Sequence, residues 1–440
     1  MAAPMDMQGE VMDPFKIEYK RYKRRNPPPD LSEIIDFDKP GNFSDKIEAY
    51  NLDSTCCQDE LVLNKFGLKP VKEWKVYRLK ESPGFIFIVN PFIPGYQRYW
   101  VKRSLKDFPE KPNMRNLDLY MEVAESDNIW ESRIHKRDPS LYSTDPPENT
   151  DFLSKLRWVT LGYHYNWGKK EYYGKEIWSS LPSDIGALTK CLASVLGFRQ
   201  YHAQAGIVNY YNMSSTLGGH VDEAEFDMSA PLLSFSFGQT AIYLQGGKTR
   251  DVKPDAVFLK SGDVMIMSGE TRWCYHSVPR ILPPAKGKPV PECFKFTEEA
   301  SGKYECDQRT GETTVEERPP EHHCVENEST QMNTSSANID PKHSSSTHTQ
   351  VGDSNLQFQN KTSHRTSTQS DDQSQTTTNS QCYDLDSVFK QFDEDMKYLK
   401  DEDNWKPFAD YLHETRINFN VRQVMKPGQS FPEEIAKPGT

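Results

Sequence analysis

The stretch PLLSFSFGQTAIYLQGG, residues 231–247, contains two short strands separated by a turn. In its first half Leu233, Phe235 and Phe237 alternate with small polar residues, which is typical of a strand with one buried face. Similar short runs flank this stretch at 206–213, 218–222, 255–269 and 273–281. Many short strands joined by regular turns predict a β sandwich or barrel.

The composition supports a sizeable folded core. The chain has 440 residues, of which 35% are hydrophobic and 12% aromatic. A net charge of −11 argues against a uniformly basic nucleic-acid-binding protein but allows a local basic groove. No run approaches the ~20 apolar residues that span a bilayer, so no membrane partner is expected. Eight cysteines without a C-x-x-C pair favour reduced thiols in an intracellular protein.

The N-terminal extension, residues 1–82, is predicted to contain a basic helix over 13–25 that ends before Pro27. Its run KRYKRR (20–25) fits a nuclear signal, a phosphate-contacting patch or a solvated helix end. These three interpretations stay open at the level of sequence.

Composition then divides the rest of the chain. Residues 298–382 are rich in Ser, Thr, Gln, Asn and acids, and we expect a disordered low-complexity insert there. It separates two parts of the predicted β core, 83–297 and 383–427, and a tail follows at 428–440. The last strand, TRINFNVRQV, is expected to return to the sheet that the chain left before the insert.

The segment GGHVD (218–222) carries a candidate metal site. Residues two apart on a strand point to one face, so His220 and Asp222 can converge on one ion. His276, in the apolar run WCYHSVPRI, can join them from a neighbouring strand. Two histidines and one carboxylate suit a non-haem Fe(II) oxygenase. Taken singly, the pair also fits a polar turn, and His276 fits a buried structural histidine.

Arg416 and Arg422 lie on the last strand at an even separation. They therefore point to one face, roughly 20 Å apart at ~3.3 Å per residue, and can hold a short dicarboxylate between them. The planar guanidinium pairs bidentately with carboxylates, although arginines at a solvated strand edge show the same pattern. Together with the histidines and the aspartate, they favour 2-oxoglutarate chemistry.

These motifs resemble the AlkB family of Fe(II)- and 2-oxoglutarate-dependent nucleic-acid dioxygenases, and most closely its eukaryotic members. The matching segments are NYYN, HVDEAE, the run from LKSGD to YHSVPRI, RINFNVRQV, and RWVTLGYHYNW at 157–167. The resemblance covers roughly 83–285 and 400–427 and implies a double-stranded β-helix, or jelly roll, with flanking helices and an N-terminal helical extension. We therefore expect a mainly β (α+β) fold.

The resemblance also implies roles for individual residues. The iron ligands would be His220, Asp222 and His276. The residues around 2-oxoglutarate would be Asn209, Tyr211, Arg416 and Arg422. The substrate-binding residues would be Trp158, Tyr165, Arg250 and Glu225, although the two aromatic residues also fit a core. Ala224 stands where bacterial relatives have an aspartate that helps to recognise the base, so the bacterial substrate preference does not carry over directly.

The implied activity is oxidative demethylation of bases, with release of formaldehyde, succinate and CO2. Methyladenine in tRNA ranks first, methyladenine in DNA second and oxidation of 5-methylcytosine in tRNA third. The base would be single-stranded or flipped. Two alternatives remain open: a protein (histone) demethylase or hydroxylase on the same iron site, and an inactive nucleic-acid-binding module. The resemblance implies the nucleus or mitochondrion, with the cytoplasm also compatible, and the sequence leaves the oligomeric state open.

Overall fold

The computed structural model describes residues 13–52, 57–120, 129–137, 152–174, 176–297 and 383–431. All of them belong to one compact unit. The insert expected at 298–382 lies outside these residues, as does the part of the expected tail after residue 431.

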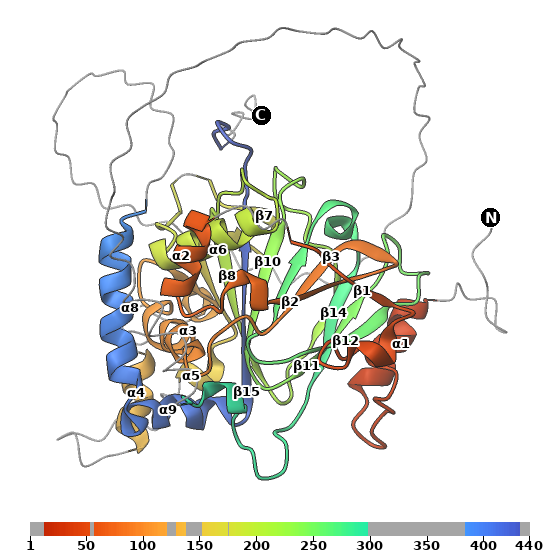
Figure 1. Cartoon of the computed structure of the whole chain (residues 1–440), viewed down its shortest axis with the longest axis horizontal. Helices are drawn as coiled ribbons and strands as arrows, with labels where there is room; N and C mark the ends of the chain where they lie inside the picture. Colours follow the sequence, from red (N-terminus) through yellow and green to blue (C-terminus); the bar gives the residue numbers. More distant parts are fainter. Residues whose placement is uncertain are drawn as a thin grey trace, which may run out of the picture. The chain divides into compact units, whose positions relative to one another are not determined.

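Two antiparallel sheets form the centre of this unit (Figure 1). The larger has nine strands in the order β1-β2-β3-β13-β10-β15-β8-β5-β4. Its strands are β1 (Ile47–Ala49), β2 (Lys75–Leu79), β3 (Ser82–Val89), β4 (Met114–Arg115), β5 (Trp158–Gly162), β8 (Ala205–Asn212), β10 (Leu232–Gly238), β13 (Val264–Met267) and β15 (Thr415–Arg422). The smaller has the order β12-β11-β14-β9, with β9 (Leu217–His220), β11 (Ala241–Gln245), β12 (Asp255–Leu259) and β14 (His276–Ile281). The predicted mainly β fold is confirmed.

Helices cover the outer face of the larger sheet, on the left of Figure 1. They are α2 (Cys57–Lys65), α3 (Gln97–Lys102), α4 (Ile129–Arg137), α5 (Phe152–Lys155), α6 (Ser183–Val195), α8 (Leu385–Leu399) and α9 (Glu402–Leu412). Their apolar side chains share one core with the sheet, where Phe392 of α8 and Trp405 of α9 join Phe235 and Phe419 of the central strands. Each fully buried side chain of this kind contributes about 1.5–3 kcal/mol. The segment after the insert is therefore integral to the core.

The alternation along β15 explains how one strand serves both the core and a site. Ile417, Phe419 and Val421 are buried in the core beneath the helices. The residues between them belong to the opposite face of the strand, because successive side chains of a strand alternate in direction. That face carries Arg416, Asn418, Asn420 and Arg422 toward the smaller sheet.

The N-terminal helix α1 (Pro14–Lys23) packs on the outer face of the smaller sheet, on the right of Figure 1. Its Phe15 is 1% exposed and lies over two glycines. A Cβ atom at Gly219 would lie 2.6 Å from the Phe15 ring, and one at Gly246 would lie 2.7 Å from it. Only glycine leaves room for the ring at these two positions. The basic helix expected over 13–25 is thus present, and Phe15 fixes it against the sheet.

Strand pairing corrects one expected boundary. As expected, β15 returns to the larger sheet, between β10 and β8. However, β1 and β2 also belong to that sheet, since β2 pairs with β3. The boundary drawn between residues 82 and 83 therefore falls inside the sheet, because strand pairing is set by partners that are distant in sequence. Among the described residues, no helix has the length and apolar character needed to cross a bilayer.

Candidate metal centre and co-substrate pocket

A cavity of about 600 Å³ lies between the two sheets. Ten of the residues predicted for the iron, co-substrate and base positions line it, with Trp167 beside them. The smaller sheet and the loop after β9 supply His220, Asp222 and His276, and the larger sheet supplies Asn209, Tyr211, Arg416 and Arg422. Of the eleven predicted site residues, Trp158 is the one that does not line this cavity.

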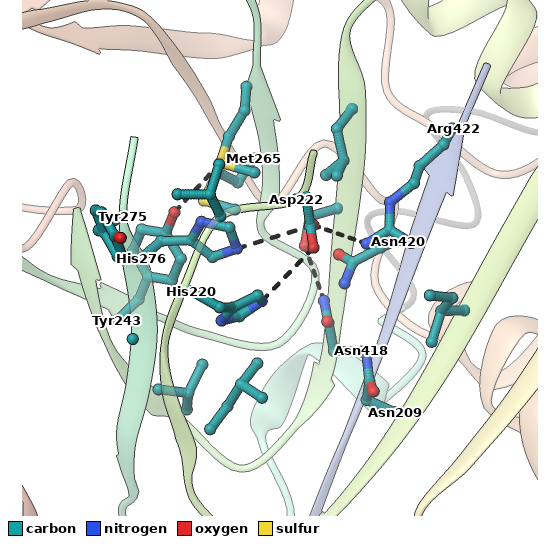
Figure 2. Close-up of a pocket in the computed structure, with 18 of the residues that line it drawn as sticks. Asn209, His220, Asp222, Tyr243, Met265, Tyr275, His276, Asn418, Asn420 and Arg422 are labelled. Carbon is teal, nitrogen blue, oxygen red and sulfur yellow. Dashed lines mark hydrogen bonds and ion pairs between the residues drawn. The ribbon is translucent and has the colours of Figure 1, made fainter. Parts of the chain in front are cut away.

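The two histidines are brought together by strand register. His220 of β9 lies directly opposite His276 of β14, and their ring centroids are 4.3 Å apart. Asp222 follows β9 and faces both rings (Figure 2). Its Oδ1 is 3.6 Å from Nε2 of His220, and its Oδ2 is 3.8 Å from Nε2 of His276. These separations are too long for hydrogen bonds but suit three ligand atoms around one ion, since bonds of ~2.1 Å hold ligand atoms roughly 3–4 Å apart.

Backbone contacts fix which nitrogen each histidine offers to a metal. Nδ1 of His220 lies 2.9 Å from the carbonyl oxygen of Gly218, and Nδ1 of His276 lies 3.3 Å from that of Cys274. A carbonyl oxygen only accepts, so each Nδ1 carries the proton and donates it. Each Nε2 then has a free lone pair directed at the centre of the triad. Among the described residues these three form the group that can hold a metal ion.

The carboxylate of Asp222 is held in its charged form. Burial alone would raise its pKa, but the charge of Arg422, with the His276 and His220 rings beside the carboxylate, outweighs burial and lowers it. Burial, with His220 nearby, lowers the pKa of His276 to about 3, so this imidazole is neutral at pH 7. An anionic carboxylate and a neutral imidazole are the forms that bind a divalent cation.

Arg416 is a buried cation whose donors are only partly used. Its side chain is 1% exposed, and Nη2 donates to Oγ of Ser236 at 2.9 Å. Nε and Nη1 have no hydrogen-bond partner. The guanidinium lies over the ring of Tyr211 at 5.3 Å, and burial lowers its pKa to about 10. A buried arginine with unpaired N–H donors is suited to bind an anionic ligand, and its planar guanidinium matches the geometry of a carboxylate.

Sequence reasoning missed two asparagines that line the same cavity. Asn418 and Asn420 lie on the cavity face of β15 between the two arginines. Asn418 donates to Oγ of Ser234 and to the carbonyl oxygen of Phe235, each at 2.8 Å, and so ties β15 to β10. The signal was available, since counting by twos from Arg416 reaches both.

Glu225 lines the cavity, but its carboxylate is engaged by the chain itself, and this does not support the expected substrate contact. Oε1 accepts a hydrogen bond from the Tyr172 hydroxyl at 2.7 Å and lies 3.3 Å from Nε of Arg422. Oε2 accepts from Arg272 at 2.8 Å. Since Arg422 also pairs with Asp222 at 2.7 Å, Glu225 positions the arginine that holds the metal-facing carboxylate.

The aromatic residues expected to contact substrate divide into two groups. Tyr165 and Trp167 line the cavity. Trp158 pairs in register with Asn209 and so shares its face, yet Trp167 stacks over it at 3.9 Å. His164 is 2% exposed and contacts Thr160, so it belongs to the core. Arg250 lines the cavity and forms an ion pair with Asp13 beside α1 at 2.8 Å.

Comparison with known proteins agrees with this geometry. Residues 117–304 match the model of the 2OG-Fe(II) oxygenase superfamily. Human nucleic acid dioxygenase ALKBH1 is 44% identical over 291 residues, which cover 64% of this chain and 74% of the human protein. DNA N(6)-methyladenine demethylase ALKBH1A of Arabidopsis thaliana is 33% identical, over 60% of this chain and 79% of that protein. The tRNA demethylase abh1 of Schizosaccharomyces pombe is 33% identical, over 62% and 87% respectively.

The human relative and the superfamily match together settle the class of protein. Members of this superfamily are dioxygenases that use Fe(II) and 2-oxoglutarate. The predictions of an oxidoreductase and of these two cofactors are therefore confirmed. The chain belongs to the AlkB family of 2-oxoglutarate- and Fe(II)-dependent dioxygenases.

Proposed function

We propose that this enzyme oxidatively demethylates N-methylated bases in nucleic acid. The observation that carries the proposal is the composition of the inter-sheet cavity. It joins the triad of His220, Asp222 and His276 to Tyr165 and Trp167, two aromatic side chains suited to a flat base. The names of the three relatives, which refer to nucleic acid, DNA N(6)-methyladenine and tRNA, support the same substrate class.

In this proposal the triad holds Fe(II), and Asn209, Tyr211, Arg416 and Arg422 surround 2-oxoglutarate. The unpaired N–H groups of Arg416 donate hydrogen bonds to the distal carboxylate, while Arg422 keeps the side chain of Asp222 oriented. Bound iron and 2-oxoglutarate supply oxidation of a methyl C–H bond with O2, coupled to loss of CO2 and formation of succinate. On an N-methyl group the product is a hemiaminal, which breaks its C–N bond to give formaldehyde and the free amine.

The substrate strand must present its base outside a helix, because a paired base does not reach a site between two sheets. Methyladenine in tRNA is our first choice, methyladenine in DNA the second, and oxidation of 5-methylcytosine in tRNA the third. Lys170 and Arg250 line the cavity and supply positive charge for the phosphates next to the base. A histone or other protein substrate is the alternative for the same iron site.

Mass spectrometry of methylated oligonucleotides tests the proposal. Wild-type protein with iron and 2-oxoglutarate should remove one methyl group from tRNA or single-stranded DNA and release formaldehyde and succinate in equal amounts. His220→Ala should abolish turnover with the fold retained, as judged by circular dichroism. Turnover of methylated histone peptides, with all oligonucleotides left unchanged, would replace this proposal with the protein-directed alternative.

We also propose an intracellular setting, in the nucleus or mitochondrion, with the cytoplasm as a further option. Cys191, Cys274 and Cys293 carry free thiols, which suits a reducing compartment. Microscopy of the tagged full-length chain tests the compartment.

A further inference from the structure

Two tryptophans form a stacked pair at the edge of the cavity. The ring centroids of Trp158 and Trp167 are 3.9 Å apart, and their planes are inclined by 23°. This separation is that of a close stack, in which each ring covers one face of the other. A base therefore has no access to that face of Trp158 while Trp167 stays in place.

The free surface of the pair belongs to Trp167. This side chain lines the cavity and is 40% exposed, whereas Trp158 does not line it. Tyr165 meets the edge of Trp167 at 5.1 Å with an interplanar angle of 88°, and it also lines the cavity. One tryptophan ring, backed by a second tryptophan and bordered by a tyrosine, thus lines the same cavity as the iron ligands.

The hairpin that carries Trp167 is anchored on both sides of the tryptophan. It consists of β6 (Tyr165–Asn166) and β7 (Glu171–Tyr172). Oδ1 of Asn166 accepts hydrogen bonds from the backbone N–H groups of Gly168 and Lys169, at 3.0 and 3.1 Å, which sets the turn. The hydroxyl of the buried Tyr172 donates to Glu225 at 2.7 Å. Trp167 is therefore placed by the fold, and the stack is not a chance contact of a loose loop.

We propose that Trp167 is the residue on which the substrate base stacks, and that Trp158 supports it from behind. The inference rests on the proposed function, because it takes the ligand to be a methylated base in a single strand. The outer face of Trp167 receives the base, and the Trp158–Trp167 pair stays together in the complex. Specificity then depends on the β6–β7 hairpin as well as on the sheet.

Binding of a single-stranded oligonucleotide with one N1-methyladenine tests this. The full chain is loaded with Mn(II) and 2-oxoglutarate, and affinity is measured by fluorescence anisotropy. Trp167→Ala should weaken binding about 5- to 150-fold, the range expected for losing one base–aromatic stack. Trp167→Phe should recover part of the loss. Trp178→Ala is the matched control, because Trp178 is 57% exposed and does not line the cavity.

The opposite arrangement gives a distinct result. If Trp167 only shields Trp158 and must leave, Trp167→Ala will bind the oligonucleotide as tightly as wild type or more tightly, and Trp158→Ala will show the large loss. That pattern overturns the proposal. Succinate formation without substrate should be unchanged in the control Trp178→Ala, because this side chain does not line the cavity. Wild-type protein that binds and demethylates no oligonucleotide would instead refute the proposed function.

Discussion

Nη2 of Arg422 lies 2.7 Å from Oδ2 of Asp222, although 200 residues separate them in the sequence. The same guanidinium faces Glu225 at 3.3 Å. Burial alone would lower the pKa of Arg422, but Asp222, Tyr172 and Glu225 raise it. The cation between two buried carboxylates therefore holds the metal-facing acid in place, and its removal leaves charge uncompensated.

Arg422→Met should lower the free energy of unfolding of the metal-free protein by about 3–5 kcal/mol, the usual result of breaking a buried ion pair from one side. Urea denaturation measures this. Lys406→Met is the control, since Lys406 pairs with Asp410 at 3.2 Å on the surface and should cost less than about 1 kcal/mol. Equal effects of the two changes would argue against the structural role of Arg422.

Arg416→Gln should weaken 2-oxoglutarate binding about 10- to 150-fold, because hydrogen bonds to charged groups contribute roughly 1.5–3 kcal/mol. Calorimetric titration with 2-oxoglutarate in the presence of Mn(II) measures the change. Arg416→Lys should recover only part of the affinity, since an ammonium keeps the charge but lacks the planar fork. An unchanged dissociation constant in Arg416→Gln would place the distal carboxylate elsewhere.

Tyr172→Phe should loosen the hairpin without disturbing the iron site. The change removes the hydrogen bond to Glu225 but leaves Arg272 and Arg422 as its partners. We expect faster amide hydrogen exchange over 165–172 and a several-fold higher KM for the oligonucleotide, with unchanged succinate formation in the absence of substrate. Glu225→Gln should also lower stability, because two buried arginines lose an acid partner. If exchange in the hairpin stays the same in Tyr172→Phe, this anchor has no role there.

Stability should depend on pH through His164. Burial lowers its pKa to about 4 from the ordinary 6.5. Between these values the unfolded chain takes up a proton that the native state refuses, so stability falls with decreasing pH by up to about 1.4 kcal/mol per pH unit. Above pH 6.5 and below pH 4, His164 does not contribute to the change of stability with pH.

The His164 prediction is measured by urea denaturation at several pH values. His164→Gln should flatten the profile between pH 6.5 and 4, while the exposed His413→Gln should leave it as in wild type. Some slope should remain in the metal-free variant, because burial also lowers the pKa of His276. A profile identical to that of wild type would show that His164 is not the titrating group.

Much of the site could be predicted from the two-residue alternation of side chains along β strands. Counting by twos along single strands placed His220 with Asp222, and Arg416 with Arg422, because a strand fixes the direction of every second side chain. The same counting reaches Asn418. A neighbouring strand was expected to bring His276 to the pair, but its register opposite His220 could not be predicted, since strand register depends on contacts across the sheet.

Two features could not be read from the sequence for physical reasons. An acid such as Glu225 looks like a substrate contact until its partners Tyr172 and Arg272 are known, because an ion pair buries a charge that composition assigns to the surface. In the run RWVTLGYHYNW, nothing indicates that Trp167 covers Trp158. That contact depends on a turn that folds the chain back over β5.

Phe15 occupies the space above Gly219, one residue before a metal-facing histidine. A catalytic fragment trimmed at residue 83 would therefore be no minimal enzyme. It would carry a hole beside His220 where an aromatic ring belongs, and it would also lack two strands of the larger sheet. Fusions and truncations designed for this protein should keep the helix that begins at Pro14.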